Sequence, residues 1–325
     1  MFESSDRPRV FALPPGADFT AELAAGILAR TSGQPPEAMA RVTVLVNTRR
    51  MQRRLKSLFS DGPARLLPRI GLVTEADLLM PDVDLPRPVS TLRRRLELAR
   101  LVAKLIDVDP SIAPRSACSD LADSLAALMD EMQGEGVAPD TLLNLDTSDQ
   151  SGHWARSLQF LSIVRQYSDA GADDYLDAEA RRRLAAFKLI ASWDAAPPTD
   201  PIIVAGSTGS RSTTSLLMEA VANLPNGAVV LPGFDFDMPD KVWMSLTDSE
   251  FSPLGAQDHP QFRIASFLAR LGLGPDSVSH WSNAVAPEKR NALISLSLRP
   301  APVTDQWLDD GPKLGDLPAC TARLA

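Results

Sequence analysis

The chain has 325 residues, of which 44% are hydrophobic and 23% are charged, a composition typical of a globular protein. No apolar run approaches the roughly 18 residues of a membrane span, and the N-terminus carries acids and prolines where a secretory signal would be basic and then apolar. Two cysteines, Cys118 and Cys320, are too few and too far apart for a zinc or iron–sulfur site within the chain. We therefore expect a cytoplasmic protein with two domains, or with one domain and a large insertion.

The net charge of −8 is distributed unevenly along the chain. Residues 1–104 hold 17 of the 33 basic residues against 11 acids, a balance of +6, which leaves −14 for residues 105–325. A basic N-terminal part favours a polyanionic partner there, although a solvated helical surface would have the same composition.

Residues 1–88 alternate short apolar runs with amphipathic segments, which predicts the first part of an α/β domain. The β-branched run at 42–46 leads into Asn47 and Thr48, both good helix caps. Strands are expected at 10–13, 42–46 and 70–73, and helices at 19–28 and 49–59.

Residues 89–197 change to long amphipathic helices without a clear strand, which predicts an all-helical insertion. Three apolar stripes should face its core. They are Leu92, Leu96, Ala99, Val102, Ala103 and Ile106; Leu121, Leu125, Leu128 and Met132; and Trp154, Leu158, Leu161 and Val164.

An α/β pattern returns at 198–240, which predicts the second part of the sheet domain. Residues 241–325 form a mixed and partly irregular continuation. Within them Pro260–Leu271 is expected to be a helix, capped by Asp258 or His259 and ended by Gly272, whereas 292–298 fits a strand or a helix. The last residues show no terminal element, so we expect a fragment of a longer chain.

The strand-to-helix loops of a parallel sheet share one edge, where ligands of open α/β sheets bind. A phosphate-binding loop needs a lysine after a glycine, and none of the six lysines follows a glycine. The first such loop instead has two prolines, which lack N–H donors, and an aspartate that would repel phosphate. This degenerate loop consists of Pro14, Pro15, Gly16, Ala17 and Asp18.

A second loop with two glycines follows the strand at 202–205 and matches no dinucleotide or nucleophile motif. It consists of Gly206, Ser207, Thr208, Gly209, Ser210 and Arg211. The glycines suit a tight turn in which Ser210, Ser212 or Thr213 caps the next helix. The alternative is anion binding at that helix N-terminus, assisted by Arg211.

Other polar residues give weaker signals for chemistry. Asp235 and Asp237 lack further ligands for a metal ion, so they are interpreted as solvated loop acids. His153, His259 and His280 have no paired-ligand spacing. We predict no catalytic residue and no metal site.

The helix that opens with Thr48, Arg49 and Arg50 and continues with Arg53 is the strongest candidate for a nucleic-acid contact. Its apolar face packs inward, so the arginines should project from the first turn, where free N–H groups also suit phosphates. A solubilising helix face is the alternative. The run Arg93–Arg95 is expected to extend the basic surface.

The order of these segments resembles the N-terminal part of AddB, a subunit of the AddAB helicase-nuclease, which processes broken DNA ends for recombination. The resemblance spans nearly the whole chain. It rests on VFALPPGADF, VTVLVNTRRMQRRLKSLF, LLPRIGLV, DEMQGEGV, HWARSLQFL, VAGSTGS, GAVVLPGFDFD and HPQF, in that order.

The resemblance implies a RecA-like parallel sheet of the P-loop NTPase and superfamily 1 helicase type, interrupted by the helical insertion. Pro14–Asp18 would stand in place of the P-loop, and Ala205, Gly206 and Ser207 in place of the acids that bind magnesium and activate water. The segment at Thr48 is similar to helicase motif Ia, which binds the backbone of single-stranded DNA. An inactivated ATPase with a retained DNA contact is therefore implied.

The resemblance further implies double-strand break repair on single- and double-stranded DNA, in a heterodimer with an AddA-type helicase-nuclease subunit. ATP and magnesium would belong to that partner, and an iron–sulfur cluster to a C-terminal nuclease outside these residues, so no cofactor is expected here. We thus expect a non-catalytic, helicase-like DNA-binding scaffold. The alternatives are a small-molecule nucleotide-binding protein that uses the Gly206–Arg211 loop with Asp235, and a protein-docking module without a ligand.

Overall fold

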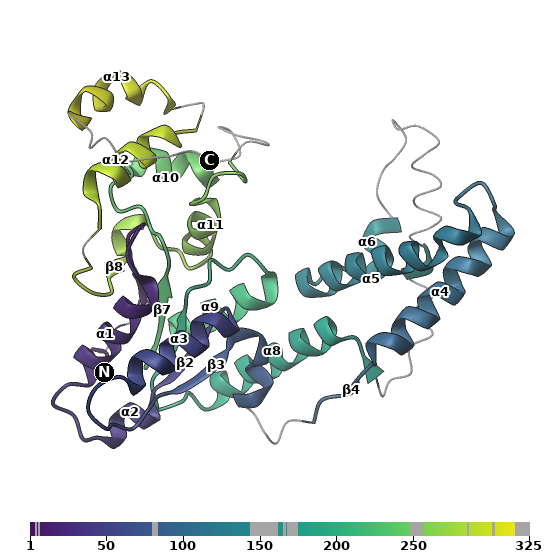
Figure 1. Ribbon diagram of the computed structural model, residues 1–325, viewed down its shortest axis with the longest axis horizontal. Coiled ribbons are helices and arrows are strands. Elements are labelled where there is room, and N and C mark those ends of the chain that lie inside the picture. Colours follow the sequence, from purple (N-terminus) through teal and green to yellow (C-terminus); the bar gives the residue numbers. More distant parts are fainter. Residues whose placement is uncertain are drawn as a thin grey trace. The chain divides into compact units, whose positions relative to one another are not determined.

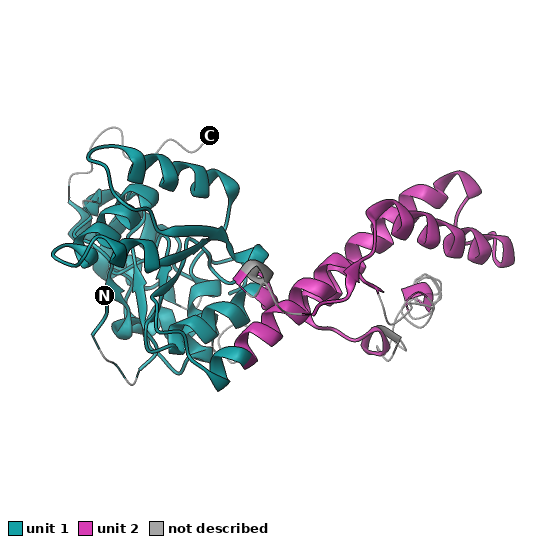
Figure 2. Cartoon of the chain, turned by 90° about the horizontal axis from the view of Figure 1, so that it is seen from below, with its two compact units in different colours: residues 1–75, 192–210, 214–325 teal, residues 76–191, 211–213 magenta. Residues whose placement is uncertain are grey.

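A computed structural model describes residues 1–3, 5, 7–79, 84–143, 162–164, 167, 175–247, 256–284, 286–300 and 303–315. The chain divides into two compact units, coloured separately in Figure 2. Unit 1 comprises residues 1–75, 192–210 and 214–325, and unit 2 comprises residues 76–191 and 211–213. None of the described helices is long and apolar enough to cross a membrane.

Unit 1 is built around a six-stranded sheet in the order β3-β2-β6-β7-β1-β8, in which every described pairing is parallel (Figure 1). The prediction of an α/β fold with a parallel sheet is confirmed. The central strands β2, β6 and β7 are buried along their whole length, as expected for runs rich in valine and isoleucine. The strands are β1 (Val10–Ala12), β2 (Thr43–Val46), β3 (Arg69–Leu72), β6 (Ile202–Ala205), β7 (Gly227–Leu231) and β8 (Ser279–His280).

Helices connect and cover these strands. The N-cap of α1 (Phe19–Thr31) is Asp18, whose carboxylate accepts from the Ala21 N–H at 3.3 Å. Gly26 inside α1 allows Trp281 to pack closely, since an added Cβ would lie 2.1 Å from the Trp281 indole nitrogen. The other helices of this part are α2 (Glu37–Arg41), α3 (Arg49–Ser60), the 3-10 helix η1 (Val73–Leu79), which continues past the boundary of unit 1, and α9 (Ser212–Asn223).

The C-terminal part of unit 1 is more helical than its sequence indicated. The helix predicted from Pro260 begins two residues later, at Phe262, and neither Asp258 nor His259 is its N-cap, which is Gln261. It ends before Gly272, which has a φ of 67° as predicted for a helix end. The ambiguous segment 292–298 is helical as far as Ser297, and Leu298 is the C-cap. The helices are α10 (Asp240–Thr247), α11 (Phe262–Arg270), η3 (Pro275–Ser277), α12 (Glu288–Ser297), α13 (Gln306–Asp310) and η5 (Gly311–Leu314).

Unit 2 is mainly helical, with α4 and α5 packed against each other through a buried apolar cluster. It also holds a short parallel strand pair, β4 with β5, which the sequence did not reveal. Its elements are β4 (Arg87–Pro88), α4 (Thr91–Val108), η2 (Arg115–Ala117), α5 (Cys118–Glu135), α6 (Pro139–Leu143), β5 (Tyr175–Leu176) and α8 (Ala178–Ala195), the last of which extends into unit 1.

The apolar stripe predicted for α4 is partly wrong. Leu92 and Leu96 are 66% and 61% exposed, whereas Arg94 is buried on the same side as Leu98 and Val102. The reason is that acidic groups from α5 and from Asp177 receive the Arg94 guanidinium, so the first turns of α4 turn a charged residue inward. On α5, Leu125 and Met132 are buried as predicted, while Leu121 and Leu128 are only partly buried. In the third stripe Val164 is buried, and Trp154, Leu158 and Leu161 lie outside the described residues.

Candidate nucleic-acid interface

Four loops of interest lie at one edge of the unit 1 sheet. Because β1, β2, β6 and β7 run parallel, their carboxyl ends share an edge, and the candidate loops follow these strands directly. Two contacts tie the loops together. The Asn47 side-chain amide after β2 donates to the Gly206 carbonyl after β6, and the Phe234 N–H after β7 donates to the Leu13 carbonyl after β1 at 3.0 Å.

The helix α3 begins at this edge, with Thr48 as its N-cap. The Thr48 hydroxyl oxygen accepts from the Met51 N–H at 3.2 Å, and the Thr48 carbonyl accepts from the Gln52 N–H at 3.0 Å. Arg49 and Arg50 are the first two residues of the helix, and their backbone N–H groups have no acceptor within it. The first turn of α3 therefore combines free backbone donors with two arginine side chains.

The basic side chains of α3 are all exposed and differ in how far they are neutralised. Arg49 has a loose ion pair with Glu75, at 3.6 Å between Nη2 and Oε1, and Arg54 pairs with Asp18. Arg50 and Arg53 have no ion pair with any residue that the structure describes. The helix thus presents at least two unneutralised guanidinium groups to solvent.

The degenerate loop at Pro14–Asp18 is a tight turn with several of its polar groups already hydrogen-bonded within the chain. The Ala17 N–H donates to the Pro14 carbonyl at 3.3 Å, and the Pro15 carbonyl accepts from the Asn291 amide of α12 at 2.8 Å. Gly16 has a φ of 83°, and a Cβ at this position would lie 3.1 Å from the ring of Pro287. The Asp18 carboxylate both caps α1 and pairs with Arg54. Nothing in this loop resembles a cradle of N–H donors for a phosphate.

The loop after β6 makes two tight turns at its glycines. Gly206 has a φ of 79°, and a Cβ there would lie 2.9 Å from the Met51 sulfur and 3.3 Å from the Phe19 ring. Gly209 has a φ of 68°, and its N–H donates to the Ser207 hydroxyl at 3.2 Å. These contacts agree with the interpretation of the glycines as turn formers.

The N-terminus of α9, where an anion would bind, is filled by a carboxylate of the chain itself. The Ser212 N–H donates to Oε1 of Glu135 at 3.1 Å. Arg211, the predicted cation of this site, pairs with Glu179 at 3.6 Å and is otherwise exposed. The hydroxyl groups of Ser207, Thr208 and Ser210 therefore flank a helix end whose charge is already balanced.

The acidic loop after β7 holds one buried and one exposed aspartate. Oδ1 of Asp235 accepts from the Asp237 N–H at 3.1 Å, and burial raises the pKa of the Asp235 carboxyl. The Gln261 side chain holds the loop by donating to the Gly233 carbonyl at 2.8 Å. Among the described residues there is no group of three or more histidines, cysteines and acids that could hold a metal ion.

The two described histidines and the described cysteine have structural roles. Nδ1 of His259 accepts from the Gln261 N–H at 3.1 Å, and burial lowers the pKa of this imidazole. His280 stacks on Phe236 with ring centres 3.8 Å apart. The Cys118 thiol donates to the Ala99 carbonyl at 3.1 Å. His153 and Cys320 lie outside the described residues.

The prediction that Arg93–Arg95 extend a basic surface is wrong. Arg93 pairs with Glu97 at 2.8 Å, Arg95 pairs with Asp123 at 2.7 Å, and Arg94 is buried in its own ion-pair network. All three charges are compensated within unit 2, so this part of α4 offers no free cation for a phosphate.

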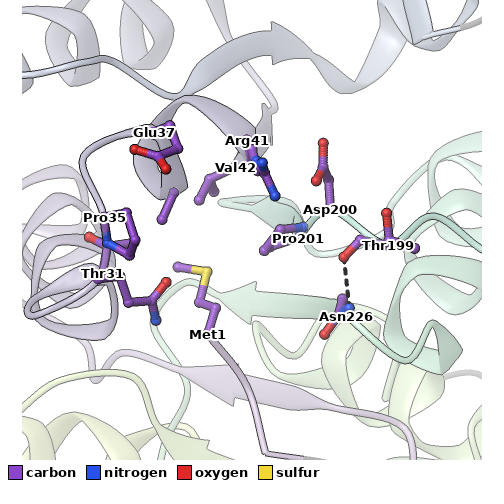
Figure 3. A pocket seen from close by; sticks show the side chains of 12 residues that line it. Met1, Thr31, Pro35, Glu37, Arg41, Val42, Thr199, Asp200, Pro201 and Asn226 are labelled. Carbon is purple, nitrogen blue, oxygen red and sulfur yellow. Dashed lines mark hydrogen bonds between the residues drawn. The ribbon is translucent and has the colours of Figure 1, made fainter.

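A polar pocket of about 330 Å³ lies at the opposite edge of the sheet, at the amino ends of the strands (Figure 3). Val42, Pro201 and Asn226, which precede β2, β6 and β7, line it, and the Asn226 amide donates to the Thr199 carbonyl at 2.8 Å. Ligands of open α/β sheets bind at the carboxyl ends of the strands, so this pocket is not part of the candidate interface.

No family model matches the chain, and no curated protein matches it. Its function must therefore be argued from the residues themselves.

Four residues support the interface through contacts that the sequence did not predict, although Asn47 was named there as a possible helix cap and Arg54 belongs to the predicted basic helix. Asn47 fixes the Gly206 loop, Gln52 donates to the Ile70 carbonyl at 2.8 Å, Arg54 neutralises Asp18, and Asn291 closes the Pro14–Asp18 turn. Only Arg54 had a local signal, since it is separated from Arg50 by four residues and shares its helix face. The other three act on backbone carbonyls distant in sequence.

Proposed function

We propose that this chain is a non-catalytic, helicase-like scaffold that binds the backbone of single-stranded DNA with the first turn of α3. The observation that carries the proposal is the pair of unneutralised guanidinium groups, Arg50 and Arg53, beside the free N–H groups of the helix start. Guanidinium forks and helix N-termini are the groups that proteins use for phosphate oxygens. Thr48 and Arg49 complete the contact.

The proposal includes a wider assignment based on the resemblance to AddB. In it the parallel sheet is the RecA-like domain of a superfamily 1 helicase, and residues 89–197 are its helical insertion. The chain would act in the cytoplasm in double-strand break repair. An AddA-type subunit would supply ATP hydrolysis. This chain would hold single- and double-stranded DNA without a cofactor of its own.

Inactivity as an ATPase is supported by the loop after β1. Pro14 and Pro15 have no N–H to donate, Asp18 carries a negative charge, and the Asn291 and Pro287 side chains pack against the turn. The rival function, binding of a small nucleotide at Gly206–Arg211, would need a phosphate to displace Glu135 from the α9 N-terminus. Isothermal titration with ATP and with a nicotinamide dinucleotide tests this rival, and micromolar binding of either would favour it.

The test of the proposed function is a double variant, Arg50→Ala with Arg53→Ala, titrated with a labelled oligothymidylate at several salt concentrations. Each lost phosphate contact should reduce the slope of log K against log salt by about 0.7, so the slope should fall by about 1.4 and low-salt affinity by roughly tenfold or more. The matched control is Arg41→Ala with Arg100→Ala, which removes two exposed arginines that lie off α3.

Equal affinity of the double variant and of wild type at low salt would sink the α3 assignment. A chain that binds no DNA and still forms a complex with an AddA-type subunit would instead favour the docking module. Both outcomes are read from the same purified proteins, by fluorescence anisotropy and by analytical ultracentrifugation.

A further inference from the structure

We propose that a pocket in unit 2 binds one base of a single strand by stacking on Tyr175, while Arg87 and Lys188 hold an adjacent phosphate. The inference rests on the proposed function in one respect, namely that the ligand is single-stranded DNA. It adds a second DNA contact in unit 2, on β4, β5 and α8, away from the residues of α3.

The pocket has a volume of about 540 Å³, within the size range of small-molecule sites. Its lining residues come from β4, from the segment just before it, from β5 and from α8. Its lining combines one aromatic ring, two cations, one carboxylate and apolar side chains. The lining residues are Asp84, Leu85, Pro86, Arg87, Tyr175, Leu184 and Lys188.

The walls of this pocket are fixed by hydrogen bonds from α8. Nζ of Lys188 donates to the Asp84 carbonyl at 2.6 Å, and Nε of Arg181 donates to the Pro86 carbonyl at 3.1 Å. On the other side, Arg87 and Tyr175 are direct partners in the parallel β4–β5 register. Because directly paired residues project from the same face of a sheet, Arg87 and Tyr175 share one face of the β4–β5 pair.

Tyr175 has the exposure and the electrostatic setting of a stacking residue. It remains 37% exposed, and the guanidinium carbon of Arg93 lies 5.2 Å from its ring centre. The cation–π attraction of an arginine holds an aromatic ring in place, and a base can then stack on the exposed part of that ring. Arg93 is itself paired with Glu97, so it positions the ring and does not compete for the phosphate.

The combination favours a single strand over a duplex. An aromatic ring can stack on any unpaired base, whereas bases in a duplex are covered by their neighbours. Arg87 and Lys188 outnumber the carboxylate of Asp84, so the pocket has a net positive charge for the phosphate next to the stacked base. Recognition by stacking is independent of sequence, as is the backbone contact proposed for α3.

The test is photocrosslinking of the whole chain to an oligothymidylate that carries one 5-iodouracil, with the crosslinked residue mapped by mass spectrometry and the affinity measured in parallel. We expect the crosslink at Tyr175. Tyr175→Ala should abolish it and weaken binding about tenfold, and Tyr175→Phe should retain both. Phe187→Ala is the matched control, because Phe187 is a 47% exposed aromatic residue on α8 that does not line the pocket.

The Tyr175→Ala results separate this inference from the proposed function. Loss of the crosslink in Tyr175→Ala with normal behaviour of Phe187→Ala supports the pocket. Unchanged affinity and an unchanged crosslink pattern in Tyr175→Ala overturn it and leave the α3 contact standing. If wild type binds no oligonucleotide, the proposed function and the inference fail together.

Discussion

Replacement of Arg94 by alanine should destabilise the helical unit more than any other single arginine substitution on α4. The Arg94 side chain is 10% exposed and reaches Asp130 at 2.6 Å, Asp177 at 3.3 Å and the Ala126 carbonyl at 3.1 Å. It therefore links α4 to α5 and to the start of α8. Without it, the Asp177 carboxylate, only 4% exposed, would keep Gln133 and Tyr167 as donors but lose its cation.

The expected loss in the free energy of unfolding follows from how deeply each charged partner is buried. Removal of one partner from a buried ion pair costs about 3–5 kcal/mol, because the other charge stays buried. Asp130 is 44% exposed, so its share is small, and we estimate the total for Arg94→Ala at about 3 kcal/mol. The matched control is Arg95→Ala. The ion pair of Arg95 with Asp123 is about half exposed, so it should contribute less than 1 kcal/mol to stability.

The assay should report on this unit alone, because a chain with two units does not guarantee a two-state transition. Native-state hydrogen exchange, followed by mass spectrometry on peptides from α4 and α5, measures the local opening free energy. A loss of about 3 kcal/mol corresponds to exchange roughly a hundredfold faster in Arg94→Ala. Exchange rates that match those of Arg95→Ala would refute the buried-network argument.

Two further predictions concern Asp235 in unit 1 and a pair of helical glycines, Gly26 in unit 1 and Gly134 in unit 2. Burial raises the pKa of the Asp235 carboxyl in the folded chain, so the ionised carboxyl lowers stability at a pH above that pKa. This loss of stability disappears as the pH falls through the pKa. Asp235→Asn should therefore raise Tm at pH 8 and have little effect near pH 4, and thermal melts across this pH range check it. A melt in which Asp235→Asn lowers Tm at pH 8 would contradict the sign. Gly26→Ala should destabilise unit 1 strongly, because the new Cβ would meet the Trp281 ring. Gly134→Ala in α5, where a Cβ would have nothing within 4 Å, should stabilise unit 2 by about 0.5–1 kcal/mol. Urea titrations compare the two variants, and similar effects on stability would contradict the packing argument.

Local signals predicted the parts of the fold that depend on neighbours in sequence. The β-branched run of β2 leads directly into Thr48, so both the strand and the cap of α3 followed from adjacent residues. Gly206 and Gly209 have positive φ values, as a turn of this kind requires. These features need no knowledge of distant contacts.

The failures arose where a distant partner decides the outcome. Arg94 is buried because it pairs with Asp130 and Asp177, which lie 36 and 83 positions further along the chain. As a result, the buried face of α4 contains Arg94, and the predicted Leu92 and Leu96 are exposed. Glu135 also reaches the α9 N-terminus from 77 residues away, so an anion bound there, the alternative that the glycine loop left open, would have to displace this carboxylate. Periodicity and spacing carry no information about such long-range charge pairs.

The Asp18 carboxylate has a consequence for how this sequence can change over time. Asp18 caps α1 and also pairs with Arg54 on α3, while the neighbouring turn is held by Asn291 and Pro287. A substitution that made the turn more hospitable to phosphate would first remove the cap, at about 1 kcal/mol, and leave Arg54 without its partner. A mutational path toward a nucleotide site in this loop thus passes through less stable intermediates.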